Sequence, residues 1–140
     1  WRHQGQAIHI YGFVTNMPRL MAGADMLVTK AGPATICEAC IAGLPVILSD
    51  AIPGQEDGNI DYVVENHIGV YAPNPSKVAN AVSEWLAEGI DAIRARGERA
   101  RAISRPQAVW DIADEVWEYA QRPMVKNARR PFLRKSSKTS

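Results

Sequence analysis

Short apolar runs alternate with amphipathic stretches along the first two thirds of the chain. The run at residues 44–49 is almost continuously apolar, which is typical of a strand buried on both faces. The stretches between such runs place apolar residues three and four positions apart, as in a helix with one buried face. The pattern predicts strands at residues 8–11, 26–29, 44–49 and 69–71, and helices at residues 16–23, 35–42, 56–66, 78–86, 91–103 and 109–119.

Strands that alternate with helices through short turns favour an α/β fold. In such a fold a Rossmann-like, mostly parallel sheet is covered by helices on both faces. We expect Asn16 to cap the first helix and Gly43 to end the second. Trp85, Trp110 and Trp117 fall on apolar helix faces, so we expect them to pack in the core or at a domain interface.

The length of 140 residues corresponds to one domain. We expect this domain at residues 1–121 and a separate tail at residues 122–140, because helical periodicity stops at Arg122-Pro123. The chain begins with Trp1, so we expect a fragment or a processed product. No apolar run approaches the roughly 20 residues that a membrane-spanning helix needs.

The net charge of +1 conceals an uneven distribution. From Ala120 onward the chain has seven basic and no acidic residues, so the part before Ala120 carries a net charge of −6. A basic tail on an acidic body favours contact with anionic lipid or nucleic acid. The alternative is a solvated, disordered terminus, as is common for short charged tails.

Cys37 and Cys40 form a C-x-x-C pair. A metal site usually needs four ligands, and neither a second pair nor suitably spaced histidines accompany these cysteines. They fall inside a predicted helix, away from the helix start where a thiolate is stabilised. We therefore expect two buried or half-buried, reduced thiols and no metal site. We expect His3, His9 and His67 at the surface or in capping positions and not in catalysis.

Two predicted strand-to-helix turns carry most of the polar chemistry. In the first, Ala31-Gly32 follows a strand and Pro33 opens a helix, where a missing N–H is harmless. Free N–H groups at such a helix start favour a phosphate, and Glu38 lies one helical turn further on, where it can accept from a sugar. The second turn, at residues 53–59, offers an amide, a carboxylate and another amide.

Both turns, and the turn at residues 12–15, follow the carboxyl ends of predicted strands. Ligands of open α/β sheets bind at this edge, so we expect one crevice there. Such a lining suits a nucleotide joined to a polyhydroxyl group. A dinucleotide site is disfavoured because no G-x-G-x-x-G follows a strand.

Each candidate residue also has a purely structural interpretation. Glu38 is compatible with an exposed helix carboxylate, and Thr35 with a helix cap. Acidic and amide residues favour helix starts, so Gln55, Glu56 and Asn59 are compatible with a solvated helix start.

Several segments occur in a specific order: Gly12-Phe13-Val14-Thr15-Asn16-Met17, Thr29-Lys30-Ala31-Gly32-Pro33, Thr35-x-x-Glu38-Ala39, Gly43-Leu44-Pro45-Val46-Ile47-Leu48 and Pro53-Gly54-Gln55-Glu56-x-Gly58-Asn59. With this ordered set the chain, from about residue 8 to residue 119, resembles the C-terminal, donor-binding half of the monogalactosyldiacylglycerol synthase family. These enzymes are MurG-like UDP-glycosyltransferases, and the resemblance implies the C-terminal domain of a GT-B glycosyltransferase. One departure is Ala34, at a place where glycine is frequent in the family.

The resemblance implies a UDP-sugar donor and assigns residues to each part of it. The main chain of Phe13 and Val14 would meet the uracil, and Glu38 would accept from the ribose hydroxyls. The remaining residues are Gly32, Ala34 and Thr35 for the diphosphate, and Gln55, Glu56 and Asn59 for the sugar.

The implied reaction transfers a hexose, galactose in the first instance, from UDP to diacylglycerol at a plastid envelope or bacterial cytoplasmic membrane. The spacing within residues 55–59 does not decide between galactose and glucose. The catalytic base and the acceptor surface are expected in a missing N-terminal half, so we assign no catalytic residue here. We also expect no metal, no cofactor and no nucleic acid. The alternatives are a stand-alone UDP-sugar-binding subunit of a two-part membrane glycosyltransferase, a UDP-sugar epimerase and a non-enzymatic interaction module.

Overall fold

Three of the predicted apolar runs form a parallel sheet in the order β3 (Leu27–Lys30), β4 (Val46–Asp50) and β5 (Gly69–Tyr71). The computed structural model describes residues 2–3 and 6–122. β4 is the central strand, and its first three residues are buried, in keeping with their unbroken apolar character. The β3–β4 register shifts after Thr29, so that Lys30 lies opposite Asp50.

Helices connect the strands as the alternating pattern predicts. They are α1 (Met17–Ala22), α2 (Pro33–Ala42), α3 (Asp57–Glu65), α4 (Pro75–Glu88) and α5 (Ile90–Ile103). A short antiparallel pair, β1 (Arg2–His3) and β2 (Gln6–Ala7), precedes them.

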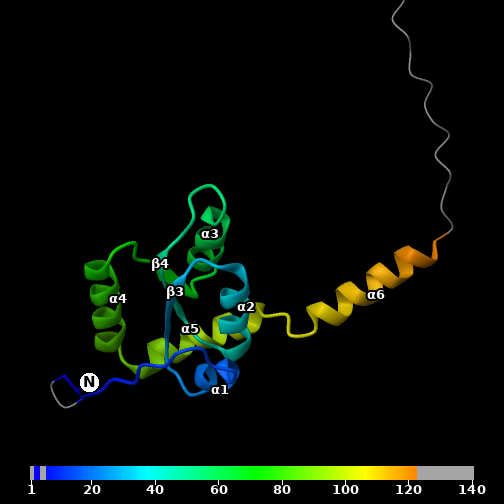
Figure 1. Cartoon of the computed structure of the whole chain (residues 1–140). Coiled ribbons are helices and arrows are strands. Elements are labelled where there is room, and N and C mark those ends of the chain that lie inside the picture. Colours follow the sequence, from blue (N-terminus) through cyan, green and yellow to red (C-terminus); the bar gives the residue numbers. More distant parts are fainter. Residues whose placement is uncertain (1, 4–5, 123–140) are drawn as a thin grey trace, which may run out of the picture. The chain divides into compact units, whose positions relative to one another are not determined.

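Helices cover both faces of the parallel sheet, which confirms the predicted fold class (Figure 1). Neighbouring residues of a strand point to opposite faces. Val46 and Leu48 accordingly join one core with residues of α1, α2, α3 and α5. Ile47 joins the other core, with Trp85 of α4 and Ile93 of α5. This arrangement leaves the turns at the carboxyl ends of β3 and β4 at one edge of the sheet.

The end of α2 is fastened by its own turn and by α5. Gly43 ends the helix as predicted, in a left-handed conformation with φ 73°. The N–H of Leu44 donates to the carbonyl of Ala39 at 2.8 Å, which satisfies a carbonyl that the helix leaves free. Arg101 of α5 donates through Nη2 to the carbonyl of Ala42 at 2.9 Å.

The predicted side-chain cap at Asn16 is wrong. Asn16 precedes α1, but its side chain forms no capping hydrogen bond, and its main-chain carbonyl accepts from Arg19 at 3.0 Å. Asn74, before α4, does cap its helix, because its Oδ1 accepts from the N–H of Lys77 at 2.9 Å. The two residues differ in backbone: Asn74 is extended, as a capping residue requires, whereas Asn16 has φ −119° and ψ 32°.

The predicted strand at residues 8–11 is also wrong. Ile8, Ile10 and Tyr11 are exposed, and no described strand runs beside them. β-Branched and aromatic residues fit a pleated surface, but a strand also needs a hydrogen-bonded neighbour. The turn at residues 12–15 therefore follows irregular chain.

The chain divides into two compact units, Trp1–Pro106 and Gln107–Ser140, whereas the sequence pattern places its boundary after residue 121. α5 ends at Ile103, two residues before Arg105-Pro106. Because proline disfavours helical geometry in the residue before it, the break between the last two helices falls at this point.

The described part of the second unit is Gln107, α6 (Ala108–Gln121) and Arg122. Trp110 and Trp117 on this helix are 68% and 67% exposed, whereas Trp85 is buried. Core packing is therefore confirmed for Trp85. Trp110 and Trp117 pack in no core among the described residues, because α6 has no second described element of its own unit to pack against, and a domain interface stays the prediction for them. Most of the predicted basic tail, residues 123–140, lies outside the described residues.

None of the described helices has both the length and the apolar character to cross a bilayer.

Candidate functional site

The turn between β3 and α2 presents main-chain N–H groups at the carboxyl edge of the sheet. α2 begins at Pro33, as predicted, and no side chain caps it. Its first main-chain hydrogen bond runs from the N–H of Ile36 to the carbonyl of Gly32 at 3.1 Å. The N–H groups of Ala34 and Thr35 therefore have no acceptor among the described residues. Together with the positive end of the helix dipole, they favour a bound anion.

A lysine to which the sequence pattern assigned no role lies over the same turn. Lys30 is the last residue of β3, and its Cε lies 3.8 Å from the position that a Cβ on Gly32 would take. Lys30 forms no ion pair with any described residue. Its place two residues before the turn glycine was the signal that could have identified it. Lys30 adds a positive charge beside the free N–H groups.

Hydrogen bonds join the turn after β4 to the turn after β3. Asn59 on α3 donates through Nδ2 to the carbonyl of Ala31 at 2.8 Å. The N–H of Ala31 donates to the carbonyl of Asp50 at 2.7 Å. Ser49 Oγ donates to the carbonyl of Thr29 at 3.2 Å. The structure thus brings the two polar turns together, and Asn59 is the side chain that links α3 to the first turn.

The loop before α3 is closed by Glu56, which is only 4% exposed. Its Oε2 accepts from the N–H of Ile52 at 2.9 Å, and its own N–H donates to the carbonyl of Ile52 at 2.9 Å. A solvated helix start is therefore the wrong interpretation for Glu56. The reciprocal pair fixes the loop that carries Gln55, which is exposed.

Glu38 lies on the exposed side of α2, at a cavity between α1 and α2. The cavity has a volume of about 310 Å³. Thr35 and Glu38 are three positions apart, so they lie on the same side of the helix. Apart from Glu38 the lining is apolar: Pro18, Met21, Ala22, Ile41 and Ala42. The Glu38 carboxylate forms no ion pair with a described residue, so it is available to accept hydrogen bonds.

Phe13 and Val14 lie in irregular chain before α1. Phe13 is fully exposed and Val14 is half-buried. No hydrogen bond among the described residues joins this segment to the two polar turns. The structure therefore links the β3 and β4 turns to each other, but it does not fasten the predicted base-contacting segment to them.

The two cysteines of α2 are free, and they differ in environment. Cys40 is buried as predicted, but Cys37 is exposed, contrary to the prediction. Burial raises the pKa of the Cys40 thiol to about 11, and the neighbouring Cys37 contributes in the same direction. The buried side of α2 is formed by Ile36, Ala39 and Cys40, and Cys37 lies about 100° around the helix from Ile36, outside this stripe.

We expect one fast-reacting thiol per folded chain. At pH 8, three units below the pKa of about 11, about one thousandth of Cys40 is thiolate, and the side chain is buried as well. Titration with a chromophoric disulfide reagent should label Cys37 quickly and Cys40 only after denaturation. Cys37→Ser should remove the fast phase, and rapid labelling of two thiols in the folded wild-type chain would contradict the described burial.

Two of the histidines that were predicted at the surface are exposed in the structure. His9 is exposed and stacks on Tyr11, with 6.4 Å between ring centroids. His67 is exposed and has a φ of 54°, which is uncommon for a residue with a side chain. No group of three or more histidine, cysteine, aspartate or glutamate residues in the described part of the chain could hold a metal ion.

Comparison with known proteins finds monogalactosyldiacylglycerol synthases among the relatives of this chain. The chain is 42% identical over 114 residues to monogalactosyldiacylglycerol synthase 3, chloroplastic, of Arabidopsis thaliana, which covers 81% of this chain and 24% of the relative. It is 44% identical over 111 residues to the probable monogalactosyldiacylglycerol synthase, chloroplastic, of Nicotiana tabacum, with 79% and 21% covered. The chain thus spans about a quarter of the length of these relatives.

A solved structure shows the same fold. The crystal structure of the glycotransferase of kitacinnamycin superposes with a TM-score of 0.51 at 19% identity, covering 71% of this chain and 27% of that one. The glycosyltransferase family 28 C-terminal domain matches residues 1–116, which include the sheet and both polar turns. The resemblance found in the sequence is therefore confirmed, and the chain belongs to the glycosyltransferase family 28 C-terminal domain family.

Proposed function

We propose that this chain is the donor-binding half of an enzyme that transfers galactose from UDP-galactose to diacylglycerol in galactolipid synthesis. The names of the relatives support this acceptor and this sugar. One observation in the chain itself carries the proposal. Asn59 ties the second polar turn to the carbonyl of Ala31, directly beside the free N–H groups of Ala34 and Thr35. Two turns that are held together in this way form one continuous lining for a nucleotide sugar.

In this proposal the diphosphate lies at the start of α2. It accepts from the N–H groups of Ala34 and Thr35 and from the Thr35 hydroxyl. Gly32 has no side chain to block its approach, and Lys30 adds a full positive charge from above the turn. Negative charge develops on the diphosphate as the sugar departs, so preorganised donors and a cation stabilise the transition state more than the ground state.

The uridine lies along the outer side of α2. Glu38 accepts from two neighbouring ribose hydroxyls, a role for which an unpaired carboxylate is well suited. The main chain of Phe13 and Val14 meets the uracil edge. Ala34 replaces the glycine that is frequent in the family, and its exposed methyl group leaves the N–H accessible.

The hexose lies against the second turn. Gln55 is exposed and contacts the sugar hydroxyls, whereas Glu56 and Asn59 orient the sugar by holding the loop and the turn in place. A loop fixed by hydrogen bonds between side chains and the main chain loses little further entropy when the donor binds, which favours both affinity and orientation.

The catalytic base and the diacylglycerol surface belong to the larger part of the enzyme, outside the quarter that this chain represents. We place the reaction at a membrane surface, in a plastid envelope or a bacterial cytoplasmic membrane. The seven basic residues from Ala120 onward support a contact with anionic lipid on that surface.

Glu38→Ala tests the proposal by calorimetry of the whole chain. The substitution should weaken UDP binding by roughly 1–3 kcal/mol, which corresponds to about a fivefold to 150-fold loss of affinity. Because the carboxylate contacts the ribose, UMP should lose the same factor as UDP. Glu98→Ala, which removes an exposed carboxylate from α5, is the matched control and should bind both nucleotides like the wild type.

Two results would count against the donor site. The first is UDP affinity that Glu38→Ala leaves unchanged. The second is a loss of UDP affinity that Glu98→Ala reproduces, because the effect would then reflect overall charge alone.

A further inference from the structure

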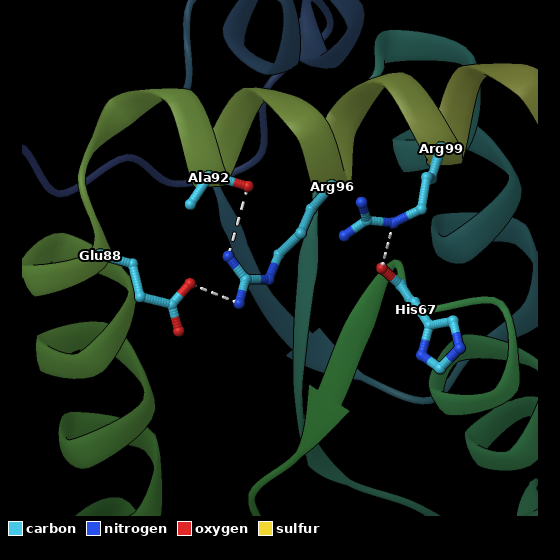
Figure 2. Close-up of polar contacts among 5 residues, drawn as sticks. All are labelled: His67, Glu88, Ala92, Arg96 and Arg99. Carbon is cyan, nitrogen blue, oxygen red and sulfur yellow. Dashed lines mark hydrogen bonds and ion pairs between the residues drawn. The ribbon is translucent and has the colours of Figure 1, made fainter.

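A cavity with two arginines in its lining lies at the opposite edge of the sheet from the proposed donor site. It has a volume of about 460 Å³ and lies at the amino end of β5, where α5 passes over it. Figure 2 shows the side chains that approach it from α5 and the His67 carbonyl at the start of β5. The lining residues are His67, Gly69, Val70, Arg96 and Arg99. Neither the donor site nor the family comparison accounts for two arginines here.

Arg99 is held in place with most of its donors unused. Its Nε donates to the carbonyl of His67 at 2.9 Å. This bond fixes the guanidinium plane, while the two terminal nitrogens have no partner among the described residues and point toward the Arg96 side of the cavity (Figure 2). Arg99 also forms no ion pair with a described residue. A fixed fork of free N–H groups matches the paired oxygens of a phosphate.

Arg96 is held in the wall of the cavity by an ion pair and a hydrogen bond to the main chain. Its terminal nitrogens pair with Glu88 at 2.6 Å and donate to the carbonyl of Ala92 at 3.3 Å. The guanidinium carbon also lies 4.8 Å from the centre of the Trp85 ring. Glu88 balances the charge of Arg96, so Arg99 carries the uncompensated positive charge of the cavity.

The main chain of β5 adds a donor to the same cavity. β5 is an edge strand, and alternate residues of a strand direct N–H and C=O to the same side. The carbonyl of Ile68 and the N–H of Ala72 both bond to β4. The N–H of Gly69 therefore points away from β4, toward the side of β5 that has no neighbouring strand in the described sheet. Gly69 also lines the cavity.

We propose that this cavity binds the phosphate group of a small phosphate ester. The Arg99 fork and the Gly69 N–H bind the phosphate oxygens, and Arg96, paired with Glu88, forms the wall beside them. The volume of about 460 Å³ exceeds what a bare phosphate fills and lies in the usual range for small-molecule sites. The ester is either a free soluble molecule or the headgroup of a lipid, since both present the same group.

The test is a residue-resolved titration of the whole isotope-labelled chain with glycerol 3-phosphate, followed by heteronuclear NMR. The Gly69 amide and the Arg99 Nε–H signals should shift together and saturate. Arg99→Gln should weaken this binding by about tenfold or more, and Arg99→Lys, which keeps the charge but loses the fork, should fall between. Arg94→Gln is the matched control, because Arg94 lies on the same helix with its side chain 71% exposed.

Thermal melts of each variant separate loss of binding from loss of fold, and Arg99→Lys keeps the test decisive if Arg99→Gln is unstable.

Vesicles of phosphatidylcholine, with and without a phosphomonoester lipid, form the second arm of the test. Saturation by glycerol 3-phosphate identifies a soluble ligand, whereas Arg99-dependent shifts with the phosphomonoester vesicles alone identify a headgroup. Absence of shifts at Gly69 and Arg99 in both arms, or equal losses in Arg94→Gln and Arg99→Gln, would overturn the proposal. UDP and Glu38→Ala report on the Thr35 amide instead, so failure of one site leaves the other measurable.

Discussion

Replacing Gly97 with alanine should destabilise the first unit by about 3 kcal/mol. Gly97 is buried where α5 crosses the end of α2, and a Cβ at this position would run into the main-chain carbonyl oxygen of Gly43. A carbonyl in the backbone cannot rotate aside as a flexible side chain can, so the two helices would have to separate. Alanine gains only about 1 kcal/mol of helix propensity over glycine, which does not offset this clash. Urea denaturation followed by circular dichroism measures the effect.

Gly58→Ala is the matched control. Gly58 lies in α3, has no atom within 4 Å of the position of an added Cβ, and should gain up to about 1 kcal/mol on substitution. The two glycine-to-alanine changes should therefore have opposite signs. A stabilised Gly97→Ala variant would show that α5 does not approach α2 as closely as described.

The close approach of α5 and α2 is a kind of feature that sequence patterns do not reveal. Gly43 was predicted to end α2, because a glycine after the last apolar residue of a helix is a local signal. The pairing of Gly43 with Gly97 joins residues far apart in the chain, and no spacing in the sequence encodes it. The core strand β4 and the helices around it could be predicted because their apolar periodicity is also local.

Two of the errors in the fold share one cause. Residues 8–11 have the composition of a strand, and Trp110 and Trp117 have the spacing of a buried helix face. Composition and spacing indicate which surface a segment can bury, but burial needs a partner. Among the described residues neither segment has one, so the segment is irregular in the first case and the tryptophans are exposed in the second.

The candidate site also has features that the sequence predicted and features that it did not. The start of α2 and the position of Glu38 on its outer side followed from the turn and the helical spacing. The burial of Glu56 and the bond from Asn59 to the carbonyl of Ala31 did not, because they depend on how two loops pack together. Amide and carboxylate residues at a helix start have the same sequence signature whether they face solvent or close a loop. Lys30 was missed because a lysine at the end of a strand is common, and only its place two residues before the turn glycine marked it.

Replacing Trp85 with alanine should destabilise the first unit by roughly 3–5 kcal/mol. Trp85 is 2% exposed and fills the core on the α4 side of the sheet, with Ile47 and Ile93. The alanine variant loses the burial of the ring and leaves a cavity that α4 and α5 cannot fill without moving. It also removes the ring beneath Arg96, a contact expected to contribute about 0.5–1 kcal/mol more. Since small domains have only about 5–15 kcal/mol of stability in total, a measurable fraction of the variant should be unfolded at 37 °C.

Two further variants test whether the stability lost by Trp85→Ala comes from the core of the first unit. Trp85→Phe keeps an aromatic ring in the cavity and should lose substantially less stability than Trp85→Ala. Trp117→Ala removes a tryptophan that is 67% exposed on α6, and its effect should stay within about 0.5 kcal/mol. Equal losses for Trp85→Ala and Trp117→Ala would mean that the α6 tryptophans are buried against a partner in solution. The pair of alanine variants therefore tests both the core of the first unit and the exposure of the second.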